Sequence, residues 1–170
     1  FLATARVATL SVQLCFYRGF NELRASPWLT DSEELARRMG RVRCEGGHTQ
    51  IRRMLRHALA EHAATPVRAV AFIGDAVEEN PDTLCDLAGQ CGLLGLPLFL
   101  FQEGNHATVE RTFRTMAKVS GGAWARFDGH SADTLASLLG AVATYAAGGR
   151  TALAKQDSKG ATLLLQQLKD

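Results

Sequence analysis

Four short apolar runs alternate with segments of helical periodicity, and this alternation restricts the chain to few folds. The runs are Val12–Tyr17, Val67–Ile73, Leu96–Phe101 and Ala123–Phe127. Strands are nearly all apolar in this way when both faces of a parallel sheet are covered. Alternation of such strands with helices is typical of an α/β domain. We therefore predict a doubly wound, mostly parallel sheet with helices on both faces.

Start and stop signals frame the segments between these runs. Thr49 can cap a helix that begins at Gln50, and Asn80 followed by Pro81 opens the next helix. Pro27 restricts its surroundings to a short edge strand, because proline is poorly tolerated in a central one. Further helices are expected at 33–40, 107–119 and 131–147, with helical periodicity again around 163–168.

Composition suits one domain of ordinary size. The chain has 170 residues, 46% of them hydrophobic, so we treat 1–170 as a single domain with a C-terminal helical extension at 150–170.

A net charge of +2 argues against nucleic acid as a partner. The longest apolar run, Leu93–Phe101, is too short for a membrane span. The four cysteines form no C-x-x-C pair and are expected as free thiols, which predicts a cytoplasmic location.

Polar residues follow the predicted strands where those strands end. Arg18, Asp75 and Glu103 each lie at or just after the end of an apolar run. Ligands collect at the carboxyl edge of such sheets, so Arg18 and Glu103 are candidate partner contacts. The chain contains no phosphate-binding glycine loop and no G-x-S-x-G nucleophile motif. A hydrolytic arrangement of Asp75, Glu103 and His106 stays open as an alternative without a supporting motif.

A metal-binding interpretation fits two of the loop residues. Magnesium takes oxygen ligands and often uses only one or two carboxylates. The hydroxyl of Thr49 and the carboxylate of Asp75 match this chemistry, and the topology can place both loops at one edge. The alternative is that both residues are helix caps. Glu78 and Glu79 directly precede Asn80, and we expect them to interact with the dipole of the helix that begins there.

An ordered series of segments resembles the von Willebrand factor type A (VWA) domain, most closely that of bacterial VWA-domain proteins of unassigned role. The segments are VQLCFYRG, GGHTQIRRMLRHAL, AVAFIGDAVEE, LPLFLFQEG and GGAWARFD, and they extend from about Thr9 to Ala147. The resemblance implies a Rossmann-like fold. It also implies a protein-interaction domain rather than an enzyme.

Many VWA domains carry a metal-ion-dependent adhesion site (MIDAS). Its motif comprises a D-x-S-x-S loop after the first strand, a threonine on a later loop and an aspartate after the fourth strand. Thr49 in GGHT matches the threonine, and Asp75 in IGD matches the aspartate. The resemblance therefore implies one Mg²⁺, or alternatively Mn²⁺ or Ca²⁺, bound by Thr49 directly and by Asp75 through water. A protein partner would complete the shell of this ion with a carboxylate.

The chain departs from this pattern in one respect, because it contains no D-x-S-x-S. That motif belongs ahead of VQLCFY, and residues 1–8 resemble the last turns of the intervening helix. We expect the first strand and its serine loop to lie ahead of residue 1, since losing a central strand would expose two apolar sheet edges. The alternative is a degenerate, metal-independent interaction domain, with a partner on the helix that carries Arg52 and Arg56. The oligomeric state is not predicted.

Overall fold

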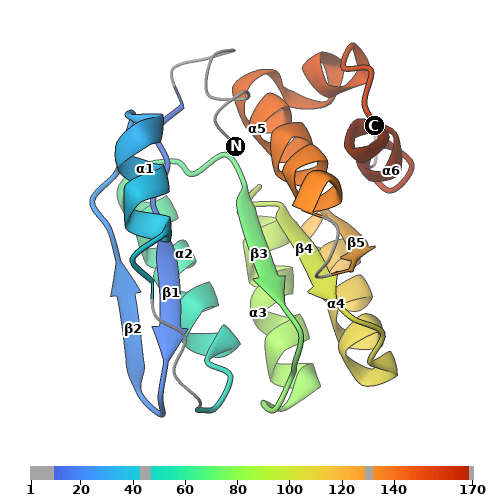
Figure 1. The fold of residues 1–170 in the computed structure, drawn as a ribbon. Coiled ribbons are helices and arrows are strands. Elements are labelled where there is room, and N and C mark those ends of the chain that lie inside the picture. Colours follow the sequence, from blue (N-terminus) through green and yellow to red (C-terminus); the bar gives the residue numbers. More distant parts are fainter. Residues whose placement is uncertain (1–9, 43–46, 129–131, 169–170) are drawn as a thin grey trace.

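A computed structural model describes residues 10–42, 47–128 and 132–168 of the chain (Figure 1). The strands in these ranges are β1 (Cys15–Arg18), β2 (Glu22–Ala25), β3 (Val70–Gly74), β4 (Leu98–Glu103) and β5 (Ala123–Phe127). The helices are α1 (Ser32–Met39), α2 (Ile51–Ala64), α3 (Pro81–Leu93), α4 (Ala107–Ser120), α5 (Ala132–Ala154) and α6 (Lys159–Leu165). Strands and helices alternate from α2 onward, so the fold belongs to the α/β class.

The strands form two separate sheets. Strands β3, β4 and β5 pair in parallel in that order, with Val70 opposite Leu98 and Phe99 opposite Ala123. Strands β1 and β2 pair only with each other, as an antiparallel hairpin. Strand β2 lies at the edge next to Pro27, as the sequence predicted.

Helices cover both faces of the three-stranded sheet. Side chains alternate between the two faces along a strand, and in β4 Leu98 and Leu100 pack with α2, α3 and α4. Phe99 and Phe101 point to the opposite face and pack with α5 and α6. Figure 1 shows the same arrangement, with α3 and α4 behind the sheet and α5 in front. Because both faces are buried, no polar alternation appears in the sequence of this strand.

The structure corrects the predicted bounds of three strands, since β1 begins at Cys15 rather than Val12, β4 begins at Leu98 rather than Leu96, and β3 also begins later than predicted. Strand β3 begins at Val70 rather than Val67, because the ring nitrogen Nδ1 of His62 lies 3.1 Å from both the backbone nitrogen and the carbonyl oxygen of Val67. The helix predicted to end at 147 does end there, and a separate helical stretch follows as far as Ala154. The predicted break is still present, since Gly148 and Gly149 have non-helical backbone angles.

Other terminations follow the local signals. Helix α4 ends at Gly121, whose φ of 75° is the left-handed conformation that glycine adopts without a steric penalty. The chain then enters β5 directly, because Gly122 lies against the backbone of Leu98, where a Cβ atom would be 2.0 Å from the carbonyl oxygen. Within the described residues, no helix is both long and apolar enough to cross a bilayer.

Candidate functional site

The start of α2 is bound to the loop that follows β3. The backbone N–H of Thr49 donates to the Glu78 carboxylate at 2.7 Å, and the backbone N–H of Glu78 donates to the Thr49 hydroxyl oxygen at 3.1 Å. This reciprocal pair joins two loops that are 29 residues apart in the chain. Donation from the Thr49 N–H is the main cause that holds the pKa of Glu78 below its usual value, and His48 contributes further.

Glu79 supplies the cap that α2 lacks in its own sequence. Gln50 occupies the N-cap position but makes no side-chain capping bond, so Thr49 is not the cap that the sequence suggested. Instead, the Glu79 carboxylate accepts hydrogen bonds from the backbone N–H groups of Ile51 and Arg52. A carboxylate in this position satisfies orphan donors and complements the positive end of the helix dipole.

The expected role of the two glutamates is therefore corrected. The Glu79 carboxylate binds the first turn of α2, and the Glu78 carboxylate binds Thr49 two residues ahead of it, rather than the helix that follows them in the sequence. Helix α3 is capped by Asn80, whose Oδ1 accepts from the N–H groups of Asp82 and Thr83 at 2.9 and 3.1 Å. An efficient local cap leaves the preceding acids available for another helix.

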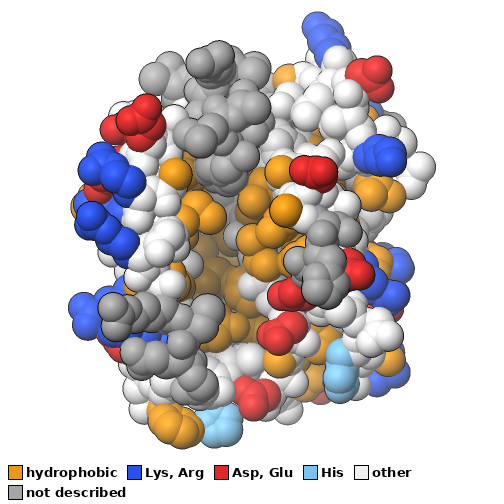
Figure 2. Space-filling view, viewed as in Figure 1, with side chains coloured by type: hydrophobic (Ala, Val, Ile, Leu, Met, Phe, Trp, Pro, Cys, Tyr) orange, Lys and Arg blue, Asp and Glu red, His pale blue; other side chains and the backbone are white. Residues whose placement is uncertain are grey.

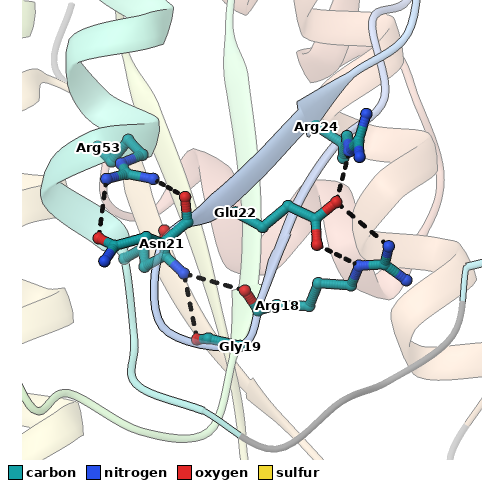
Figure 3. Close-up of polar contacts among 7 residues, drawn as sticks. Arg18, Gly19, Asn21, Glu22, Arg24 and Arg53 are labelled. Atoms are coloured by element: carbon teal, nitrogen blue, oxygen red, sulfur yellow. Dashed lines mark hydrogen bonds and ion pairs between the residues drawn. The ribbon is translucent and has the colours of Figure 1, made fainter.

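The same end of α2 is also bound to the β1–β2 hairpin. The Gln50 side-chain amide donates to the carbonyls of Arg18 and Gly19 at 3.2 and 3.3 Å. Arg53 donates to both the backbone and the side-chain oxygen of Asn21 in the turn (Figure 3). A glycine is required just ahead of α2, since a Cβ atom on Gly47 would lie 2.0 Å from the Gly19 carbonyl oxygen. The first turn of α2 thus links the carboxyl ends of β1 and β3.

Arg18, a candidate partner contact, is engaged within the hairpin. Its guanidinium forms two bonds to Glu22, at 2.7 and 3.2 Å, and Arg24 contacts the same carboxylate (Figure 3). The two arginines lower the pKa of Glu22 to about 2, with the Arg18 hydrogen bond as the largest cause. Glu103, the second candidate contact, is exposed at the end of β4.

Asp75, the candidate metal ligand, is exposed directly after β3. Among the described residues it forms no hydrogen bond or ion pair, in contrast to Glu78 and Glu79. Its charge nevertheless acts on the site, because the pKa of the half-buried Tyr17 is raised to about 12. Burial is the main cause, followed by the charges of Glu79, Asp75 and Glu78. These carboxylates therefore form a negative field at the ends of β1 and β3.

The two predicted ligands fit a magnesium-type ion in chemistry but not in number. Both provide oxygen, and the Thr49 hydroxyl oxygen, which accepts one hydrogen bond, retains a second lone pair. Magnesium needs six oxygens, so two protein donors leave most of the shell to water or to other groups. In the described ranges no group of three or more His, Cys, Asp or Glu side chains is arranged to hold a metal.

The alternative hydrolytic set is not assembled by hydrogen bonds. His106 occupies the N-cap of α4, and its backbone carbonyl accepts from the Gln102 side chain at 3.0 Å. In the part of the chain that the structure describes, no hydrogen bond or ion pair joins the His106 ring to Asp75 or Glu103. The three residues share one edge of the sheet without forming a nucleophile–base pair of the kind that such chemistry uses.

The surface around this edge combines acidic and apolar groups. Figure 2 shows a hollow lined by hydrophobic side chains near the middle of the molecule, with acidic side chains along one of its rims. No protein-family model matches the chain, and comparisons with curated proteins and with solved structures give no significant match.

Proposed function

We propose that this protein is an interaction domain that binds a protein partner through a divalent-metal site at the carboxyl edge of its sheet. The observation that carries the proposal is the reciprocal pair between Thr49 and Glu78. It fixes the Thr49 loop to the loop that contains Asp75, so a hydroxyl and a free carboxylate share one edge. Thr49 would bind the ion directly, and Asp75 would bind it through water.

The electrostatics of the edge support a cation. Glu78 and Glu79 are held by backbone N–H groups, but their charges still act on the Tyr17 hydroxyl. A bound Mg²⁺ would reduce the repulsion between these carboxylates and Asp75. Such an ion can take a further carboxylate from a partner, and Glu103 lies exposed at the end of the neighbouring strand, where a partner could reach it.

The VWA resemblance is part of the same proposal. A parallel sheet covered by helices on both faces is compatible with that family, although the three paired strands form a small sheet. The family assigns the remaining ligands to a serine-containing loop after a first strand. A loop of that kind would supply the donors that Thr49 and Asp75 do not.

A metal-independent interaction domain is the second candidate. It is favoured by the absence of a three-residue ligand group in the described ranges. In that case Thr49, Glu78 and Glu79 act only as structural links, and the partner contacts the exposed face of α2. Arg52 is exposed on that helix and forms no ion pair among the described residues.

Calorimetric titration of Mg²⁺ and Mn²⁺ into the native protein separates the two candidates. The metal proposal expects binding that weakens at least about tenfold in Asp75→Ala and in Thr49→Val. Asp82→Ala is the matched control, because Asp82 is an exposed acid in the first turn of the adjacent helix. Equal affinity in the wild type, Asp75→Ala and Thr49→Val would reject the site. Partner capture that persists in excess EDTA would favour the metal-independent domain.

A further inference from the structure

Strand β5 is the outermost strand of the parallel sheet, with β4 paired along one edge (Figure 1). Along the other edge, the Trp124 N–H donates to Oε1 of Gln167 at 3.0 Å, and Nε2 of Gln167 donates to the Trp124 carbonyl at 2.7 Å. A neighbouring strand would offer the same acceptor and the same donor to one residue of β5. The side-chain amide of Gln167 therefore occupies the place that a paired strand would take.

Two residues further along β5, Arg126 directs its backbone groups to the same edge. Successive residues of a strand point their backbone groups to opposite sides, so Arg126 shares the outward direction of Trp124. In the described ranges no hydrogen bond engages the N–H or the C=O of Arg126. An open sheet edge of this kind can pair with a further chain. The edge is thus closed at Trp124 by one side chain and open at Arg126.

The Gln167 side chain can leave this edge while the helix that carries it stays in place. Gln167 is exposed and lies in the turn that follows α6. Its neighbours Leu164 and Leu168 are buried in the core on the front of the sheet, and they fix the backbone of this segment. Rotation of the Gln167 side chain therefore breaks its hydrogen bonds to Trp124 and leaves the packing of α6 intact.

The side of the edge that faces α4 is basic. The Arg114 guanidinium lies 3.9 Å from the centre of the Trp124 ring, and Glu110 accepts hydrogen bonds from both Arg114 and Arg126. The two arginine side chains remain 55% and 43% exposed, and each guanidinium keeps further N–H donors. Residues 107–127 contain four basic side chains and a single acid, Glu110. An acidic neighbour is therefore favoured on this side.

The side of the edge that faces α6 is apolar. Leu163 is 44% exposed there, and its carbonyl accepts a hydrogen bond from the Gln167 amide at 3.1 Å, next to Trp124. The side chains of an added strand alternate between the two sides of the sheet. Acidic residues of such a strand would face Arg114 and Arg126, and the apolar residues between them would face Leu163.

We propose that the β5 edge binds an extended peptide segment of another protein in which acidic and apolar residues alternate. The segment adds to the sheet as a further strand, bonds to the backbone of Arg126 and replaces Gln167 at Trp124. A second copy of β5 fits less well as the occupant, because it would bring the arginines of both copies together. The proposal does not depend on the metal site.

Nuclear magnetic resonance titration of the native protein tests this assignment, with an acetylated peptide of four Glu-Val repeats as the probe. We expect shifts of the backbone amides of Trp124 and Arg126 and of the side-chain amide of Gln167, with an affinity that falls as salt is added. A peptide of four Glu-Pro repeats keeps the charge but lacks half of the backbone donors, and it should bind at least about fivefold more weakly. Absence of shifts in β5, or equal binding of the two peptides, would overturn the proposal.

Two variants separate backbone pairing from charge, and the titration of the native protein stands whether or not they fold. Gln167→Ala opens the edge at Trp124 and should raise the peptide affinity about fivefold, whereas Gln166→Ala, at the adjacent exposed glutamine, should leave it unchanged. Arg126→Glu should lower the affinity at least about tenfold, and Arg52→Glu on α2, across the molecule from β5 (Figure 1), is its matched control. Self-association of Gln167→Ala without peptide in sedimentation would overturn the proposal, since a second copy would then be the occupant.

Discussion

The cap that Glu79 provides to α2 yields the most specific prediction about stability. Glu79→Ala removes an acceptor for the backbone N–H groups of Ile51 and Arg52, and Gln50 offers no substitute from its side chain. Loss of a helix cap costs about 0.5–2 kcal/mol, and loss of the charge at the helix dipole adds about 0.3–1 kcal/mol. Since Glu79 is only partly buried, we expect a loss of about 1.5–2 kcal/mol in the free energy of unfolding. Glu79→Gln keeps the shape of the acceptor and should lose about half of this.

Chemical denaturation combined with hydrogen exchange measures the effect and locates it. Exchange should accelerate at the amides of Ile51 and Arg52 and not in the first turn of α3. Asp82→Ala is the control, because it removes an acid from that turn of α3, where the cap is Asn80. We expect it to cost about 0.5 kcal/mol. The reasoning fails if Glu79→Ala costs no more than Asp82→Ala, or if the faster exchange occurs in α3.

Three further predictions concern packing and pH. Gly92→Ala should lower the free energy of unfolding, measured in denaturation curves, by about 2 kcal/mol or more, because the new Cβ would lie 2.3 Å from the carbonyl oxygen of Val119. Gly89→Ala on the same helix meets open space and should raise that free energy by about 0.5–1 kcal/mol. The pKa of Tyr17, raised from 10.0 to about 12, adds stability below pH 10 that is lost as the pH rises through 12. Ultraviolet titration should show this late ionisation, and added Mg²⁺ should lower the pKa of Tyr17 if the metal proposal holds. The pKa of Glu22, lowered from 4.5 to about 2 chiefly by Arg18, adds stability above pH 4.5 that is lost as the pH falls toward 2; Glu22→Gln should flatten the pH dependence of the denaturation midpoint in that window, and an unchanged slope would contradict the assignment.

Local patterns predicted most elements because they depend on neighbouring residues. Strand β5 has the predicted bounds, and α4 ends one residue beyond the predicted end, at a glycine pair that stops helices in any context. Pro81 opens α3 as expected, with Asn80 as the cap. The edge position of β2 also followed from one proline, which cannot donate to a neighbouring strand.

Longer-range partners could not be obtained in this way. Glu79 lies 28 residues from Ile51, so its role depends on which loops the sheet brings together. The sequence placed Glu79 beside the nearest helix start, where an acid is normally favourable, but a second helix was closer in space. Arg18 was predicted to lie at the ligand edge, and only the hairpin geometry showed that Glu22 engages its guanidinium.

The sequence by itself determined the α/β class, the order of the elements and the residues at the strand ends, because hydrophobic periodicity and turn chemistry act over short stretches. The tertiary structure alone decided which strands pair, that Glu79 caps α2, and that the rings of Tyr17 on β1 and Phe72 on β3 stack. Those features arise where segments distant in the chain compete for the same hydrogen bonds and the same buried surface.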